Sequence, residues 1–346
     1  MSTIHPSTPT KTGTTAAATP GRPLLSSDRR SVLIGAVLLV ALVAAGALTI
    51  DGFSSANNIS SMLLLASFLG IACVGQTLVA LLGGLDLSIP FVIGSANLAT
   101  LWLIGKGLPA PLAILVILIV GVVVGVLNGV LSIRIQGQSL IITLAVGFAL
   151  VGLTQIITSL GSPLGGTVSG QAPDWLTGFS SLSGTSFGIR LPPVVLLWAI
   201  LAAAALLAIK WTTFGRALYA VGGNRRAAGY ALLSERRTWI GVHAISGFTA
   251  ALTGIVLLGF TGGGFVGVGD PYLFLTVAAV VVGGTSLLGG HGGYGRTILG
   301  ALVLTVLASL LVGYGLSTAA QQTVLGLLII PMVALYARSP HPKTRV

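Results

Sequence analysis

The sequence predicts an all-α integral membrane protein with about ten transmembrane helices, and three observations lead to this fold class. Hydrophobic residues make up 54% of the 346 residues and charged residues only 7%, against about 25% charged residues in soluble proteins. Uncharged apolar runs such as 31–50 and 111–130 are long enough to cross a bilayer as helices, which takes roughly 20 residues. The short alternating segments of a β-barrel do not occur. Lipid is therefore the expected solvent for most of the chain.

Ten apolar stretches, each bounded by Gly, Pro or charged residues, are the expected spans. The first follows Arg29 and Arg30, and its length of about 19 residues exceeds the h-region of a signal peptide, so we expect it to remain as a helix. Segment 1–30 is rich in Ser, Thr, Pro and Ala and is expected to be a disordered cytoplasmic tail. The ten spans, within a transmembrane domain over 31–337, are 32–50, 61–83, 87–105, 110–131, 139–160, 192–210, 238–260, 272–288, 297–316 and 319–337.

The basic residues predict the orientation of these spans. The 17 Lys and Arg against 6 Asp and Glu give a net charge of +11, but they lie between apolar runs instead of forming a stripe on a soluble domain, so no nucleic-acid partner is expected. With ten spans and an internal amino terminus, only Lys106 and Arg190 fall outside. Both termini, including the tail 338–346, are therefore expected in the cytoplasm. The basic residues assigned to the inside are Lys11, Arg22, Arg29, Arg30, Arg134, Lys210, Arg216, Arg225, Arg226, Arg236, Arg237, Arg296, Arg338, Lys343 and Arg345.

Two long polar segments separate the spans. Segment 161–191 is rich in Gly and Ser and is expected on the outer side, as a periplasmic loop. Segment 211–237 is expected on the inner side and carries five Arg. It is either a basic loop held against anionic membrane lipid or a docking element for a cytoplasmic partner.

The sequence predicts no catalytic residue, no metal site and no cofactor on this chain. A phosphate-binding loop of the form Gly-x-x-x-x-Gly-Lys-Ser/Thr does not occur, so the chain is not expected to hydrolyse ATP. The four His are scattered, and neither His pairs nor carboxylate pairs have the spacing of metal ligands. The chain is therefore not expected to be an enzyme.

Asp86 interrupts a long uncharged stretch within the motif Gly84-Leu-Asp86-Leu-Ser88. A charge at membrane depth is costly unless it is paired, caps a helix or lines a wet cavity. One interpretation is that Asp86 or Ser88 caps the third span, with Pro90 in its first turn. Direct contact with a transported solute is the other, and the two interpretations are compatible because broken helices often line transporter sites.

A second Gly-rich break follows the eighth span, at Gly283, Gly284, Thr285 and Ser286. It serves packing alone or forms part of a cavity. The motif Gly-Gly-Leu-Asp before the third span and Gly-Val-Gly-Asp before the eighth lie five spans apart. This spacing indicates a possible inverted repeat of five plus five spans.

The polar residues inside the spans are mostly neutral. This pattern suits an uncharged, hydroxyl-rich solute better than an ion, although each side chain could instead form hydrogen bonds between helices. The candidates for a solute path are Gln76, Thr77, Asn97 and Asn128, with Thr143, Thr154 and Gln155 as further polar positions.

Taken together, five ordered stretches resemble the membrane permease subunits of bacterial ABC importers for ribose, xylose and related simple sugars. The resemblance extends over about residues 60–335. It implies a multi-pass protein of the bacterial inner membrane that works with a second permease copy or a paralogue, a cytoplasmic ATPase carrying ATP and Mg²⁺, and a periplasmic sugar-binding protein. The matching stretches are 75–79 (Gly-Gln-Thr-Leu-Val), 84–88, 140–144, 221–224 with 227–228, and 278–290.

The resemblance also assigns the contact with the ATPase to segment 215–228, which the charge pattern had separately indicated as a docking loop. The residues concerned are Gly215, Arg216, Asn224, Arg225, Ala227 and Ala228. Pro90, residues 274–276 and residues 234–237 depart from the usual family pattern. Two alternatives stay open: a branched-chain amino-acid ABC permease of the same architecture, and an ion-coupled secondary carrier.

Overall fold

The structure, a computed structural model, describes residues 27–135, 139–159, 167–168, 170–186, 188–317, 319–324 and 326–327. Over these residues the chain is a helical bundle with one two-stranded antiparallel ribbon. Most of the tail expected over 1–30, the tail 338–346 and most of the last expected span, 319–337, lie outside the described residues.

Seven of the described helices are long and apolar enough to cross a membrane, and two shorter apolar helical segments cover 89–105 and 266–282. In chain order the elements are α1 Ser27–Thr49, α2 Ala56–Leu81, α3 Ile89–Gly105, α4 Ala110–Arg134, α5 Ser139–Ser159, β1 Thr167–Val168, α6 Asp174–Ser180, α7 Pro193–Trp211, α8 Thr213–Gly223, α9 Arg225–Tyr230, α10 Glu235–Thr261, β2 Gly264–Phe265, η1 Val266–Gly269, α11 Tyr272–Val282 and α12 Tyr294–Gly313.

Nine of the ten expected spans coincide with helices among the described residues. The span expected over 272–288 is too long, because α11 ends at Val282 and the chain turns at Gly284, whose φ of 83° is left-handed. Such a φ favours glycine and stops a helix. The α1 helix begins at Ser27, inside the segment expected to be a disordered tail.

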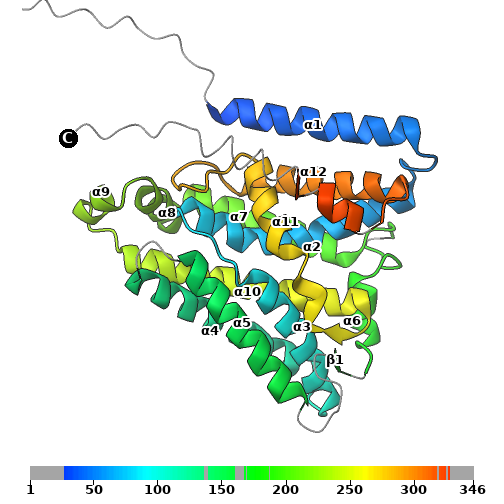
Figure 1. Ribbon diagram of the computed structural model, residues 1–346, viewed down its shortest axis with the longest axis horizontal. Coiled ribbons are helices and arrows are strands. Elements are labelled where there is room, and N and C mark those ends of the chain that lie inside the picture. The colour runs from blue at the N-terminus through cyan, green and yellow to red at the C-terminus, as the bar shows by residue number, and fades with distance from the viewer. Residues whose placement is uncertain are drawn as a thin grey trace, which may run out of the picture.

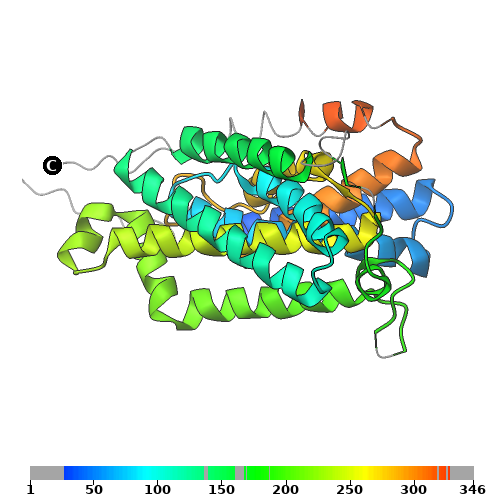
Figure 2. The ribbon, with the colours of Figure 1, turned by 90° about the horizontal axis from the view of Figure 1, so that it is seen from below.

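The connections between helices gather at the two ends of the bundle (Figure 1). One end holds α8, α9 and the loop 283–293, and the other holds α6 and the β1–β2 ribbon. Figure 2 shows the same separation after a quarter turn, with α10 running the length of the molecule between the two ends. We refer to them as the α9 end and the α6 end.

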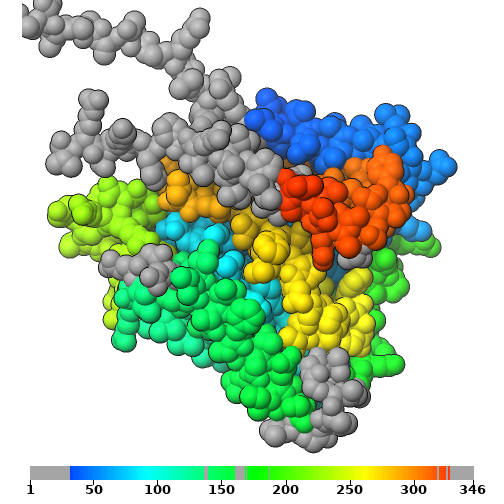
Figure 3. All heavy atoms as spheres, viewed as in Figure 1, coloured from blue at the N-terminus to red at the C-terminus, as the bar shows by residue number. Residues whose placement is uncertain are grey.

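The centre of the bundle is formed by α2 and α10. In the most apolar stretch of each helix, 89% of the residues of α2 and 67% of those of α10 are buried, against only 11% for α1. In Figure 3, α1 lies along one edge, and a strip of the α2–α3 region appears in cyan between α5 and α11. The aliphatic side chains that α1, α4 and α5 expose suit a lipid solvent.

Glycines allow the helix backbones to approach closely in this core. A Cβ on Gly94 of α3 would collide with the carbonyl oxygen of Val266, and one on Gly125 of α4 would collide with that of His243. Small residues at helix interfaces are the usual means of tight packing in membranes. The closeness of α3 to η1, and of α4 to α10, therefore depends on these two glycines.

Replacing Gly94 by Ala should lower the thermal stability of the detergent-solubilised protein, because the Val266 carbonyl must move to admit a methyl group. The expected loss is about 1–3 kcal/mol, as for other overpacked sites. The control is Gly152→Ala on α5, where a Cβ meets nothing within 4 Å, and which should be neutral or slightly stabilising. Equal melting temperatures for Gly94→Ala and the parent chain would contradict the close packing of α3 on η1.

Candidate functional site: the Asp86 turn and the α8–α9 segment

The turn between α2 and α3 holds a buried carboxylate. After α2, Gly83 takes a left-handed φ of 78°, and Asp86 follows with a side chain only 2% exposed. Its Oδ1 accepts hydrogen bonds from the Ser88 amide (3.0 Å) and the Ser88 hydroxyl (2.5 Å). Its Oδ2 accepts one from the Ser246 hydroxyl of α10 (2.6 Å). Three donors therefore stabilise the carboxylate without a cation among the bonded groups.

The expected capping of the third span is only partly correct. Ser88 is the N-cap residue of α3 and Pro90 lies in the first turn, but the Ser88 side chain makes no capping bond to the helix. Its hydroxyl donates to Asp86 instead and accepts from Asn128 Nδ2 (2.8 Å). Asp86 does accept an amide hydrogen, from the cap residue itself. The Ser88 hydroxyl is therefore engaged by Asp86 and Asn128 and is not available to cap α3.

The four candidate path residues fall into two pairs. Thr77 donates to Thr297 Oγ1 (2.9 Å), and the Asn97 amide donates to the Gly254 carbonyl and accepts from the Phe265 amide. Their polarity is accounted for by contacts within the protein. Both amide atoms of Gln76, and Asn128 Oδ1, are buried without a hydrogen-bond partner among the described residues.

The second Gly-rich break meets the first. Past α11, Thr285 Oγ1 accepts from the Gly293 amide (3.2 Å), and the Ser286 amide donates to the His291 carbonyl (3.0 Å), which folds 283–293 into a compact loop. From this loop the Gly290 amide donates to the Leu81 carbonyl at the end of α2 (2.9 Å). The two breaks, predicted separately from the sequence, are therefore adjacent.

The α8 helix lies against this junction. Thr212 caps it by accepting from the Gly215 amide (3.2 Å). Near its end, Gly222 is so close to the Leu81 carbonyl that a Cβ would collide with it, and the Tyr219 hydroxyl donates to the Gly292 carbonyl (2.7 Å). A displacement of α8 must consequently involve both breaks.

The α9 helix is short and mostly exposed. Asn224 closes α8 and caps α9, accepting from the Ala227 amide (3.0 Å). Arg216, Arg226 and Ala227 are exposed. Ala228, expected on the docking face, is only 4% exposed and packs in this chain's own core, so a bulky residue there would disturb the fold first.

Arg225 was expected to contact the ATPase, but it already has two contacts within the chain. Its guanidinium forms an ion pair with Glu235 (3.2 Å) and lies 5.0 Å from the ring centre of Trp239. Glu235 belongs to the segment that departs from the family pattern. The sequence could not reveal this pairing, because ten residues separate the partners.

Two exposed apolar residues at the α9 end had no signal in the sequence pattern. Tyr230 is 90% exposed and Leu232 is 93% exposed. Leu232 also has a φ of 58°, the one left-handed non-glycine among the described residues. Its turn is closed by bonds from the Leu232 amide to the Gly229 carbonyl and from the Leu233 amide to the Ala228 carbonyl, a helix ending that normally uses glycine.

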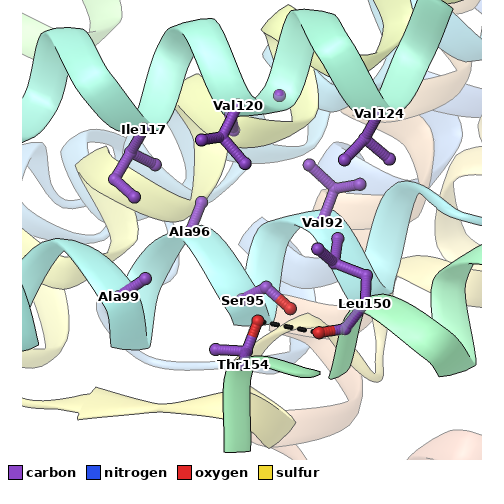
Figure 4. Close-up of a pocket in the computed structure, with 11 residues that line it drawn as sticks. Val92, Ser95, Ala96, Ala99, Ile117, Val120, Val124, Leu150 and Thr154 are labelled. Atoms are coloured by element: carbon purple, nitrogen blue, oxygen red, sulfur yellow. Dashed lines mark hydrogen bonds between the residues drawn. The ribbon is translucent and has the colours of Figure 1, made fainter. Parts of the chain in front are cut away.

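A pocket lies between α3, α4, α5 and α10, with Ser95 and Thr154 facing one another across it (Figure 4). Its volume is about 40 Å³ and its lining is almost entirely apolar. That space is comparable with a single water molecule. The pocket cannot hold a sugar.

A family model described as the branched-chain amino acid transport system / permease component matches residues 58–333. The chain belongs to this permease family. The ribose import permease protein RbsC of Haemophilus influenzae is 32% identical over 78% of this chain and 81% of its own length. The probable ABC transporter permease protein YphD of Escherichia coli is 33% identical over 87% and 88%.

A third relative, the autoinducer 2 import system permease protein LsrD of Escherichia coli O157:H7, is 29% identical over 71% of each chain. No solved structure matches. The permease is thus a membrane transport component of the inner membrane and not an enzyme, and seven of its described helices are long and apolar enough to cross a membrane. The resemblance to ABC importer permeases is confirmed, and the relatives named for ribose favour the sugar importers over the branched-chain amino-acid systems.

Replacing Asp86 by Leu should lower the amount of folded permease in the membrane and its melting temperature. The Ser88 amide and the Ser88 and Ser246 hydroxyls would lose their acceptor, at about 1–3 kcal/mol for each buried group left unpaired. Asp86→Asn keeps an acceptor oxygen and should be milder. The measurement is expression and melting of the three proteins side by side. A Leu variant as stable as the parent would show that the carboxylate is dispensable.

Proposed function

We propose that this permease forms the membrane path of an ATP-driven importer for a simple sugar delivered by a periplasmic binding protein. The observation that carries the proposal is the similarity, over most of the chain, to permeases named for ribose and autoinducer 2 import. The neutral polar side chains near the Asp86 turn are consistent with an uncharged, hydroxylated solute. ATP and Mg²⁺ would bind to the partner ATPase.

The proposed orientation places the α9 end in the cytoplasm and the α6 end in the periplasm. Arg134 ends α4, Lys210 lies in the last turn of α7, and Arg216 and Arg225 lie on α8 and α9, all at the α9 end (Figure 1). Positive residues prefer the cytoplasmic side. Ten spans with both termini inside would satisfy this preference.

The contact with the ATPase is proposed to be the exposed surface of α8 and α9 together with Tyr230 and Leu232. Large apolar side chains that project into water from a cytoplasmic loop favour a protein partner, and aromatic residues are common anchors of interfaces. Leu232 holds a strained conformation that costs about 1–2 kcal/mol, and such strain is usually retained where it serves a function. Arg216 and Arg226 would add charge complementarity.

An inverted repeat of five plus five spans is also proposed. Both α2 and α10 are long, central helices, and each is followed by a Gly-containing break, an aspartate and a shorter helix. The aspartates are Asp86 before α3 and Asp270 before α11. In Figure 1 the two long helices run in opposite directions, as an inverted repeat requires.

The solute path is proposed to need a second permease copy or a paralogue. The pocket between α3, α4, α5 and α10 is too small for a sugar, which favours a solute path along a surface that a neighbouring subunit covers. Gln76 and Asn128, with buried polar atoms free of partners among the described residues, are the residues proposed to meet the solute or its water when the helices move.

The transport proposal is tested in liposomes holding the permease with or without its partner ATPase, with the binding protein added. Uptake of labelled ribose should require both the ATPase and ATP, because the permease has no phosphate-binding loop. Labelled leucine is the control solute. Uptake of leucine in place of ribose would favour the amino-acid alternative, and uphill uptake by the permease alone on an ion gradient would overturn the importer assignment.

Leu232→Gly should weaken binding of the ATPase by about tenfold, as expected when a large apolar side chain is removed from an interface that buries it. The melting temperature of the permease should stay the same or rise, because glycine takes the left-handed conformation without strain. The matched control is Ile189→Ala, which removes an exposed aliphatic side chain at the α6 end and should leave binding unchanged. The measurement is co-purification from detergent extracts. Undiminished binding by Leu232→Gly would remove this residue from the interface.

A further inference from the structure

A continuous set of contacts connects α9 with the Asp86 turn, and Trp239 lies at its centre. On the α9 side, the Arg225 guanidinium lies 5.0 Å from the centre of the indole ring and is held there by its ion pair with Glu235. A cation over an aromatic face is attracted by the ring quadrupole. The position of Arg225, and with it the start of α9, is therefore tied to Trp239.

On the membrane side, the same ring touches the Asp86 turn. Trp239 is 4% exposed, and a Cβ built on Gly84 would lie 3.1 Å from its Cη2 atom, so the ring edge lies directly against the Gly84 backbone. Interiors are close-packed and transmit displacements of this kind. Gly84 lies two residues before Asp86, and its φ is not among the left-handed ones.

A second route to the turn passes through His243. Its ring stacks on Trp239 at 5.4 Å and 18°, and its Nδ1 bonds to the Trp239 carbonyl (3.0 Å). Ser246, three residues further along the same face of α10, donates to Asp86 Oδ2. The Trp239 ring thus contacts the turn at Gly84, and α10 contacts it a second time through the bond from Ser246 to Asp86.

This layer contains several buried polar atoms without partners among the described residues: Trp239 Nε1, His243 Nε2, Asn128 Oδ1 and Ser132 Oγ. Each lies on α4 or α10 near the turn. Polar atoms in such a layer gain hydrogen bonds when the helices shift or water enters. The layer is consequently a place where the bundle can change its packing.

We propose that Trp239 is a positioning residue, which passes a displacement of α9 to the Asp86 turn when the ATPase binds ATP. The inference rests on the proposed function, since it requires α9 to meet the ATPase. It adds the route by which that contact reaches the membrane interior: from Arg225 to the Trp239 ring, and from the ring to Gly84 and, through α10, to Asp86. Trp239 touches no solute and no nucleotide in this scheme.

The test follows the turn directly and needs no knowledge of the solute. Ser139 Oγ would lie 3.3 Å from a Cβ on Gly84, so a Ser139→Cys variant reports on the turn, and the one native cysteine, Cys73, is buried. The permease with its ATPase, in liposomes, is labelled with a maleimide in the presence and absence of ATP and Mg²⁺. We expect ATP to change the labelling rate by at least about fivefold, the lower end of the usual coupling between two sites.

Trp239→Leu should abolish the ATP-dependent change while the ATPase still co-purifies and hydrolyses ATP. Trp239→Phe keeps an aromatic face for Arg225 but loses the Cη2 atom that meets Gly84, so it should weaken the change without abolishing it. Trp198→Leu is the control for loss of a buried tryptophan, because Trp198 donates to Tyr294 and packs against Gly70 of α2. If Trp239→Leu fails to fold, Gly84→Ala is the alternative variant, and it should reduce the ATP-dependent change because its methyl group meets Trp239 Cη2. Combining Gly84→Ala with Trp239→Phe, which removes Cη2, should restore the change.

Each outcome decides the question. An unaltered ATP response in Trp239→Leu, or in Gly84→Ala, would overturn the role of Trp239. A parent complex that hydrolyses ATP without any change at position 139 would overturn it as well, while leaving the proposed transport function intact. Failure of the ATPase to co-purify with the parent permease would instead refute the proposed function.

Discussion

A single carboxylate buried in a membrane bundle is the constraint on which this structure depends. A buried carboxyl group is costly without hydrogen-bond donors, and Asp86 obtains them from its own turn and from α10. The chain must therefore leave the α2 helix, turn at Gly83 and bring Ser88 and Ser246 together around one side chain. The break in the helical path and the position of α10 follow from this requirement.

The glycines of this chain place the rest of the machinery around that turn. Gly222 on α8 and Gly290 in the second break both meet the carbonyl of Leu81, where α2 ends. A side chain at Gly222 would separate α8 from the junction. The proposed contact surface at the α9 end and the breaks inside the bundle are consequently joined by direct contacts, through which an event at a bound ATPase would change the packing between helices.

The sequence was sufficient to predict those features that depend on local composition. Apolar runs located nine of the helices, and the isolated charge of Asp86 marked the turn. Contacts between distant residues could not be predicted, since Ser246 lies 160 positions from Asp86. Nothing in the local pattern indicated that Glu235 would form an ion pair with Arg225 or that Ala228 would face the core. The left-handed conformation of Leu232 could not be predicted, because nothing in the sequence distinguishes a leucine in such a turn from other leucines.

The most direct test of the account is to cross-link the permease to its ATPase from single introduced cysteines, with a reagent that joins cysteine to lysine. Because the native Cys73 is buried, one exposed cysteine acts alone. A cysteine at position 232 should yield a cross-linked permease–ATPase product, and one at position 189, at the α6 end, should not. A product from position 189, or none from position 232, would contradict both the orientation and the assignment of α9 to the ATPase.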